Sequence, residues 1–327
     1  MPVSPSLRVI HPALWARRVK DTMHVLVTGA SGYIGAALVP RLRADGHGVR
    51  GYGRSAARVR VELDEFVEGD AILGAGLDRA LDGVEVAYFL IHSMEGAGNG
   101  FADHERRAAE QFAVAAAAAG VRRIVYLGGL VPSDAGQGLS RHLASRLAVE
   151  ELLLAAAPES IALRASIVIG ARSRSFRFLV RLVERMPVLA LPAWRDNRTA
   201  PVDGRDMLTF LSRAATAPRE LSGRSWDIAG PDVMSYGELV ERIADAMLVS
   251  RPRVGIDVTM TGLASVVAAA IADEDVGLIA PLMESLEHDL LPRHDAAPAF
   301  GVRLHSFDAA VERALRDWEH DEELAAR

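Results

Sequence analysis

The chain has 327 residues, half of them apolar, a net charge of −6 and no cysteine; its single lysine is Lys20. The absence of cysteine excludes disulfides, zinc–thiolate sites and cysteine nucleophiles, and no basic cluster resembles the patch that a nucleic-acid partner requires. The longest mostly apolar stretch, 258–272, is shorter than the roughly 20 residues of a membrane-spanning helix. We therefore expect a cytoplasmic protein with no nucleic-acid or membrane partner and leave its oligomeric state open.

Residues 1–22 contain three prolines and lack the continuous apolar core of a secretory signal, so we interpret them as an N-terminal extension. From residue 23 to about 170, strand and helix patterns alternate. The patterns predict strands at 24–28, 48–52, 65–68, 84–91, 123–127 and 161–169, and helices at 33–44, 77–81, 104–119 and 141–156. This order predicts α/β crossovers, a parallel sheet with helices on both faces, and a ligand at the carboxyl ends of the strands.

After residue 170 the pattern is weaker. A helix is predicted at 176–184, and a loop that contains several prolines follows it. A strand is then expected at 225–228 and a helix at 236–247. Residues 250–327 mix helices with turns. We expect 171–327 to supply the remaining sheet elements and a small substrate lobe rather than an independent domain.

Three glycines follow the first strand and begin the first long helix, with the spacing G-x-x-G-x-x-G. The first glycine permits a tight turn, the second lets the backbone approach a diphosphate, and the third allows close helix–strand packing. The diphosphate would meet free N–H groups and the positive end of the helix dipole. This context predicts a doubly wound Rossmann sheet with a dinucleotide on Gly29, Ser31, Gly32, Tyr33, Ile34 and Gly35.

The end of the second strand is expected to meet the adenine ribose. No acidic residue stands in the segment 51–55, whereas Arg54 lies 19 residues after Gly35 and is followed by Ser55. A guanidinium can pair with a 2′-phosphate, so we expect NADP, with NAD as the other possibility; a solvated loop arginine is the alternative. Asp70, after the third strand, is placed to reach the adenine edge or to serve as a turn aspartate.

The chain resembles the extended and atypical branches of the short-chain dehydrogenase/reductase superfamily. The resemblance rests on the glycine turn and on Trp226–Pro231 followed by Ser235–Leu239, which are similar to the late strand, turn and helix of sugar-nucleotide epimerases. It implies the fold and a nicotinamide cofactor. It also implies a catalytic tyrosine and a lysine four residues later, but no tyrosine of this chain precedes a lysine, and His142 and Arg146 occupy that spacing.

His142 and Arg146 therefore have two interpretations. In one they face the cofactor, with His142 as the general acid and Arg146 on the ribose or a substrate anion; in the other His142 is hydrated and Arg146 pairs with Glu150. His92, which follows the apolar strand, is a second candidate proton donor or a contact for the nicotinamide ribose; an ordinary loop histidine is the alternative. Backbone around Leu90, Ile91 and Ser93 is expected beside the cofactor.

Several other polar residues have a structural interpretation. Arg164 lies within an apolar strand, so it is expected in a structural ion pair or as an anchor for a substrate carboxylate. Asp206 is expected to cap a helix. His288, Asp289 and His294 match no metal-site spacing, and we expect no metal.

The leading functional hypothesis is an NADP-dependent oxidoreductase that transfers hydride to or from a small organic substrate without the usual Tyr/Lys pair. The alternatives are a non-catalytic NADP-binding redox sensor or assembly factor similar to NmrA-type regulators, and a nucleotide-sugar epimerase or dehydratase.

Overall fold

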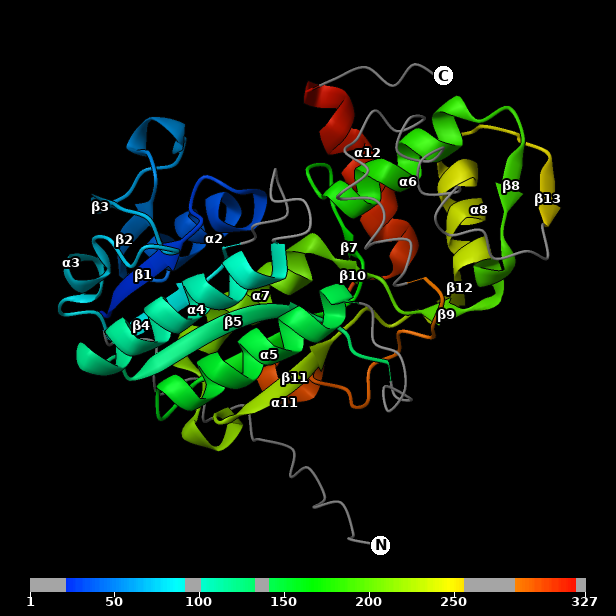
Figure 1. Cartoon of the computed structure of the whole chain (residues 1–327). Coiled ribbons are helices and arrows are strands. Elements are labelled where there is room, and N and C mark those ends of the chain that lie inside the picture. The colour runs from blue at the N-terminus through cyan, green and yellow to red at the C-terminus, as the bar shows by residue number, and fades with distance from the viewer. Residues whose placement is uncertain (1–21, 92–100, 133–140, 256–285, 322–327) are drawn as a thin grey trace, which may run out of the picture.

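The computed structural model describes residues 22–91, 101–132, 141–255 and 286–321. Seven parallel strands form the central sheet in the order β3-β2-β1-β4-β5-β6-β11 (Figure 1). Their bounds are β1 His24–Thr28, β2 Gly48–Gly53, β3 Glu65–Glu68, β4 Val86–Phe89, β5 Arg123–Gly129, β6 Ile161–Ala165 and β11 Arg224–Ile228. The expected parallel Rossmann sheet is confirmed.

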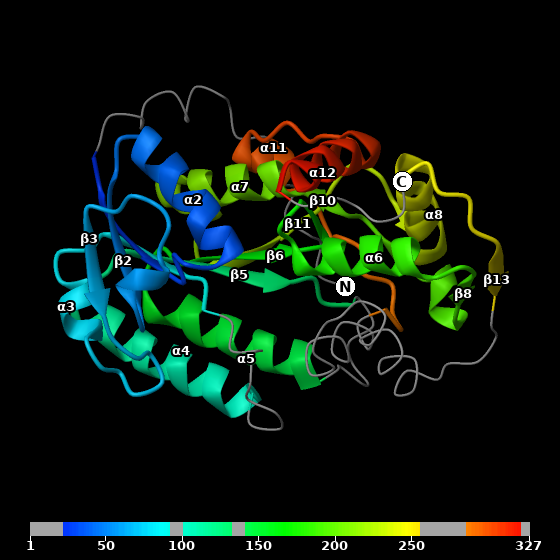
Figure 2. The ribbon, with the colours of Figure 1, turned by 90° about the horizontal axis from the view of Figure 1, so that it is seen from above.

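Helices cover both faces of this sheet (Figure 2). One face carries α2 (Tyr33–Ala44), α7 (Gly204–Thr216) and α11 (Ala297–Phe300), and the other carries α3 (Leu77–Leu81), α4 (Phe101–Ala118) and α5 (Arg141–Ala156). Each face has its own apolar core, because the strands are buried on both sides and send alternate side chains to opposite faces.

The strand order reverses between β1 and β4, which is where open α/β sheets bind ligands. Thr28, the last residue of β1, holds the two strand ends together. Its Oγ1 donates to the carbonyl oxygen of Tyr88 at 3.0 Å and accepts from the N–H of Leu90 at 2.9 Å. The glycine turn thus begins beside the end of β4.

A third apolar core lies in the C-terminal half, among α6 (Arg174–Arg185), α8 (Tyr236–Ala246) and α12 (Phe307–Asp321). Three short strand pairs lie in this half of the chain: β7 (Val168–Ile169) with β10 (Val202–Asp203), β9 (Arg198–Thr199) with β12 (Met234–Ser235), and β8 (Leu189–Leu191) with β13 (Arg253–Gly255), the last at the outer edge of the lobe (Figure 1). Single 3₁₀ turns occupy Ala56–Arg58, Ala193–Asp196 and Arg219–Leu221.

The strand predicted at 161–169 is in fact two strands. The chain leaves β6 after Ala165, where the N–H of Ser166 donates to the carbonyl of Ile228, and the carbonyl of Ile167 accepts from Val202. These bonds direct β7 away from the sheet and toward β10. The connection carries the chain from the sheet domain into the lobe.

Arg123, at the start of β5, is fully buried and closes the end of α7. Its guanidinium donates to the carbonyl oxygens of Ala214, Ala215 and Ala217 at 2.7–2.9 Å and pairs with Glu159 at 2.9 Å. These carbonyls end a helix and have no partner within it. Arg123 therefore attaches α7 to the sheet.

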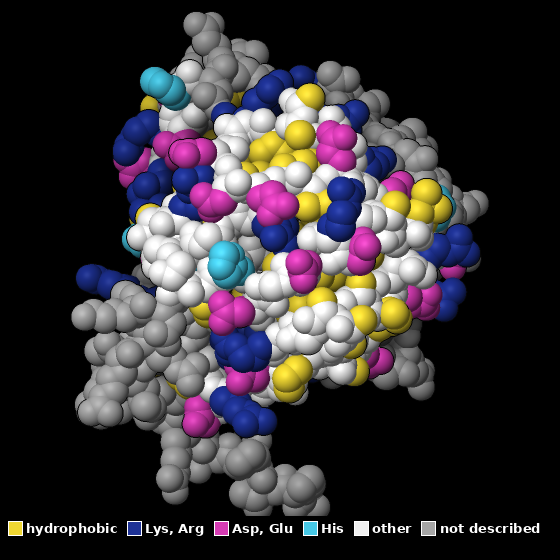
Figure 3. Space-filling view, turned by 90° about the vertical axis from the view of Figure 1, so that its left-hand side faces the viewer, with side chains coloured by type: hydrophobic (Ala, Val, Ile, Leu, Met, Phe, Trp, Pro, Cys, Tyr) yellow, Lys and Arg dark blue, Asp and Glu magenta, His cyan; other side chains and the backbone are white. Residues whose placement is uncertain are grey.

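The surface around β3 and α3 carries basic and acidic side chains side by side (Figure 3). Two of the ion pairs near it are Arg43–Glu62 at 3.0 Å and Arg50–Glu65 at 2.6 Å. Among the described helices, none is both long and apolar enough to cross a membrane.

Candidate functional site

The glycine turn has the geometry that close packing requires. Gly29 has φ +70°, and a Cβ on it would lie 2.8 Å from the carbonyl oxygen of Leu90 at the end of β4. A Cβ on Gly35 would lie only 2.3 Å from the carbonyl oxygen of Gly29. The first glycine therefore makes the turn, and the third brings α2 against it.

The N-terminus of α2 has backbone N–H groups that no side chain of the cap occupies. Gly32 is the N-cap and provides no side-chain hydrogen bond, and no acidic residue lies in the first turn. The first helical bond runs from the N–H of Ala36 to the carbonyl of Gly32, at 2.9 Å, and both Ser31 and Gly32 are exposed. The N–H groups of Tyr33, Ile34 and Gly35 precede that bond and lie at the positive end of the helix.

The residues expected at the adenine ribose lie after β2 and β3. Arg54 directly follows β2 and is exposed, and the half-buried Ser55 precedes the turn at 56–58. Asp70 lies in a turn after β3, where its Oδ1 accepts from the N–H of Ile72 at 2.8 Å and its backbone pairs with Ala75. One carboxylate oxygen of Asp70 thus stabilises the turn.

The residues whose backbone is expected beside the cofactor come after β4. Leu90 is buried and Ile91 is half-buried, and both follow β4 next to the end of β1. His92 and Ser93 lie outside the described residues. The same holds for the side chain of His142, whose backbone lies in the first turn of α5.

Arg146 points from α5 to the carboxyl end of β5. Its Nη2 donates to the carbonyl of Leu127 at 2.6 Å, and Nη1 lies 3.7 Å from Oε1 of the buried Glu105 on α4. The alternative pairing of Arg146 with Glu150 is wrong, because Glu150 binds Arg164. Arg146 therefore lies where α4, α5 and β5 meet.

Arg164 is in the structural ion pair that its place in an apolar strand predicts. Its guanidinium makes two bonds to the Glu150 carboxylate, at 2.8 and 2.5 Å, and lies 4.0 Å from Asp227. Ser225 donates to the same carboxylate at 2.5 Å. Burial raises the pKa of Asp227, while His294 and Arg164 act to lower it.

Asp206 was expected to cap α7, and this is wrong. Asp203 caps α7 by accepting from the N–H of Arg205 at 2.8 Å, whereas Asp206 binds the backbone N–H and the Nδ1 of His305 at 2.7 and 2.6 Å. Because Asp203 is the cap, α7 begins at Gly204, about one turn before the start that a cap at Asp206 would give. The sequence Val202-Asp203-Gly204 contained this signal.

His288, Asp289 and His294 do not form a cluster of possible metal ligands. Asp289 pairs with Arg198 at 2.7 Å, and the Nε2 of His294 accepts from the N–H of Asp227 at 3.3 Å. Within the described residues no three histidine, aspartate or glutamate side chains lie close enough together to hold a metal ion.

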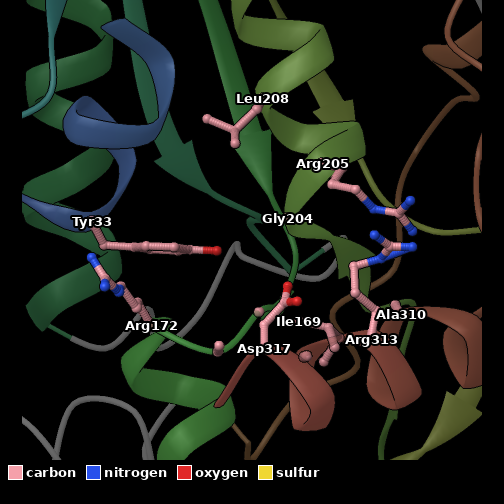
Figure 4. A pocket seen from close by; sticks show the side chains of 12 residues that line it. Tyr33, Ile169, Arg172, Gly204, Arg205, Leu208, Ala310, Arg313 and Asp317 are labelled. Carbon is pink, nitrogen blue, oxygen red and sulfur yellow. The ribbon is translucent and has the colours of Figure 1, made fainter. Parts of the chain in front are cut away.

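The side chain of Tyr33 lines a cavity that the sequence did not indicate. Its hydroxyl points across a cavity of about 250 Å³ toward Gly204 (Figure 4). A Cβ on Gly170 would lie 2.3 Å from this hydroxyl oxygen, and one on Gly204 would lie 2.8 Å from it. Two glycines distant in sequence therefore make room for Tyr33, which the turn motif identified only as a cofactor contact.

Comparisons with known proteins agree with this geometry. Residues 29–163 match the model of the NAD(P)H-binding family. The (4-alkanoyl-5-oxo-2,5-dihydrofuran-3-yl)methyl phosphate reductase of Streptomyces griseus is 28% identical over 322 residues, which cover 92% of this chain and 99% of the relative. The ceramide reductase of Caulobacter vibrioides is 34% identical over 212 residues, which cover 59% of this chain and 61% of the relative.

Among solved structures, the dTDP-glucose 4,6-dehydratase of Streptomyces venezuelae, which has NAD bound, is similar with a TM-score of 0.65 at 19% identity. The match covers 92% of this chain and 98% of the dehydratase. At that identity the likeness concerns the fold alone. Residues 29–163 thus resemble NAD(P)H-binding domains in sequence, and the chain shares its fold with this dehydratase and with a short-chain dehydrogenase/reductase superfamily protein of Agrobacterium tumefaciens that has NAD bound.

Proposed function

We propose that the protein is an NADP(H)-dependent reductase that delivers hydride to a carbonyl, enone or imine of a small organic substrate. The observation that carries this proposal is the glycine turn at the strand-order reversal, where an uncapped helix N-terminus meets the end of β4. Both relatives described above are named as reductases, and the substrate name of the first contains alkanoyl and oxo groups. The protein supplies the position of the cofactor, which is a large part of such catalysis.

The preference for NADP(H) rests on Arg54. It is exposed directly after β2, where a 2′-phosphate would arrive, and the segment 51–55 has no carboxylate to hold a free 2′-hydroxyl. A guanidinium offers a paired, charge-assisted contact to phosphate. Arg58, four residues after Arg54 and the last residue of the 3₁₀ turn, is a second arginine in the segment that follows β2.

Replacing this side chain tests the cofactor assignment. We expect Arg54→Gln to raise the Kd for NADPH by about 10- to 100-fold, the range for one charged hydrogen bond, and to leave the Kd for NADH unchanged. The matched control is Arg60→Gln, since Arg60 is also exposed in this loop and its guanidinium binds the carbonyl of Ala57. Fluorescence titration measures both constants, and equal losses for the two cofactors would remove the argument for NADP.

The proton that accompanies the hydride is assigned to a histidine. His92 comes shortly after β4 in the sequence, and His142 is the second residue of α5, the helix that follows β5. Reduction of a carbonyl takes one hydride from the nicotinamide and one proton from such an acid, and gives an alcohol. We propose that Arg146 holds the ribose or a substrate anion near the end of β5, although it already binds Leu127.

The activity is tested by mixing purified protein and NADPH with a panel of ketones, enones and imines and following absorbance at the nicotinamide band. Turnover that falls in His92→Gln or His142→Gln supports the reductase and identifies its acid. Tight binding of both redox forms of the cofactor without turnover, together with a co-purifying protein, supports a redox sensor instead. The sequence offers one argument for that alternative: its single lysine is Lys20, so no lysine stands at the position of the catalytic lysine of short-chain dehydrogenases/reductases. Turnover of a nucleotide sugar without net oxidation would indicate an epimerase or dehydratase.

A further inference from the structure

The cavity at Tyr33 lies between the sheet domain and the C-terminal lobe. Its lining comes from the start of α2, the segment after β7, the start of α7 and the middle of α12 (Figure 4). Its volume of about 250 Å³ is below the range of pockets that hold drug-sized ligands. The cavity is therefore suited to one small group rather than to a whole cofactor.

Most of the charged side chains in this lining are positive. Arg172, Arg205 and Arg313 line the cavity, and Asp317 is the one acidic residue among its lining residues. In Figure 4 the guanidinium groups of Arg205 and Arg313 lie on the same side of the cavity. Like charges placed together are unfavourable unless an anion lies between them.

Arg205 and Arg313 differ in how they are held. Arg205 is fixed by Asp203, with its Nη2 2.6 Å from the carboxylate, so its orientation is set before any ligand arrives. The Nε of Arg313 is buried and has no hydrogen-bond partner among the described residues. A buried donor without a partner is costly, and an anionic oxygen is the partner that such a donor favours.

Two further donors face the same space. Burial raises the pKa of Tyr33 to about 12, with smaller effects from Asp203 and Asp317, so its hydroxyl keeps its proton at neutral pH and can donate. Gly204 is the first residue of the 13-residue helix α7, whose positive end therefore lies at the cavity wall. The Asp203 cap occupies part of that helix end and opposes an anion there.

We propose that this arginine cavity, lined by Arg172, Arg205, Arg313 and Tyr33, binds a phosphate group separate from the cofactor diphosphate. A tetrahedral dianion can accept from several donors at once, which is what guanidinium groups and a hydroxyl on different walls offer. The phosphate can be an ester on the substrate or a free anion. The binding itself does not depend on the reductase activity proposed above.

The test is calorimetric titration of inorganic phosphate and of phenyl phosphate into the full chain, with and without saturating NADPH. We expect phosphate to bind in both conditions, and Arg313→Met, which keeps an apolar stem of similar length, to weaken that binding by at least about 10-fold. Arg316→Met is the matched control, because Arg316 lies on the same helix, is 70% exposed and pairs with Glu312. Arg172→Gln is a second variant in case Arg313→Met alters folding, which circular dichroism would detect.

Three results would overturn the proposal: no phosphate binding, equal binding by wild type and Arg313→Met, or loss of all phosphate binding when NADPH is saturating. The last would place the phosphate on the glycine turn. A phosphorylated carbonyl substrate preferred over its dephosphorylated form by wild type, but not by Arg313→Met, identifies the substrate as the source. Phosphate binding without that preference identifies a free anion.

Discussion

The turn around Gly35 allows a quantitative test of the cofactor site. In Gly35→Ala, the new Cβ would lie 2.3 Å from the carbonyl oxygen of Gly29 and 2.9 Å from the Cα of Ala30, both on the backbone. Ordinary heavy-atom contacts lie at about 3.5 Å, so the start of α2 must move by about 1 Å relative to the turn. Such a displacement breaks hydrogen bonds from the turn to charged phosphate oxygens, each worth about 1.5–3 kcal/mol, so we expect the Kd for NADPH to rise by about 100-fold.

Fluorescence titration with NADPH measures this change, and urea unfolding shows that the variant is folded. Overpacking at the turn is expected to lower the free energy of unfolding by about 1–3 kcal/mol. Gly48→Ala is the matched control: Gly48 lies at the amino end of β2, at the opposite end of the strands from the glycine turn, and its Cβ would meet His24 at an ordinary 3.5 Å. A folded Gly35→Ala protein that binds NADPH as tightly as Gly48→Ala would refute the reasoning.

Two further changes test the packing and the electrostatics. Arg123→Met removes the donors of three buried helix carbonyls, so the free energy of unfolding should fall by about 3–5 kcal/mol in urea titrations; a loss as small as that of Arg316→Met, expected below about 0.5 kcal/mol, would contradict this. Burial lowers the pKa of His294, whose Nε2 accepts from the N–H of Asp227, so the unfolded chain takes up a proton before the folded one does. Stability should therefore fall as the pH drops below about 6.5, by at most about 1.4 kcal/mol per pH unit; His294→Gln should flatten this slope in thermal unfolding scans, and identical slopes would exclude His294 as the cause.

Local sequence patterns predicted the first half of the fold well. The strand at 24–28, the helices at 33–44 and 141–156, and the strand at 65–68 have the predicted bounds. These segments follow from the periodicity of their own residues and from glycines that end them. The glycine turn was likewise predictable, because its three glycines are close in sequence.

The second half was less predictable, because its elements depend on partners far away in the chain. Strands of two residues, such as β7 and β10, have no periodic pattern and form only when they meet. Helix α12 did carry a signal, since buried residues recur at three- to four-residue spacing: Phe307, Ala310, Val311, Ala314, Leu315 and Trp318. The cavity at Tyr33 could not be predicted from the sequence, because its lining residues 33, 170, 204 and 313 are far apart in the chain.

The fit of Tyr33 between Gly170 and Gly204 has an evolutionary consequence. A Cβ at position 170 would lie 2.3 Å from the Tyr33 hydroxyl oxygen, so an alanine there requires Tyr33 to move, whereas a phenylalanine at position 33 has no oxygen at that point. Neighbours of this kind do not contribute independently to stability. In sequences related to this one, tyrosine at 33 should therefore accompany glycine at 170, and substitutions at the two sites should arise together.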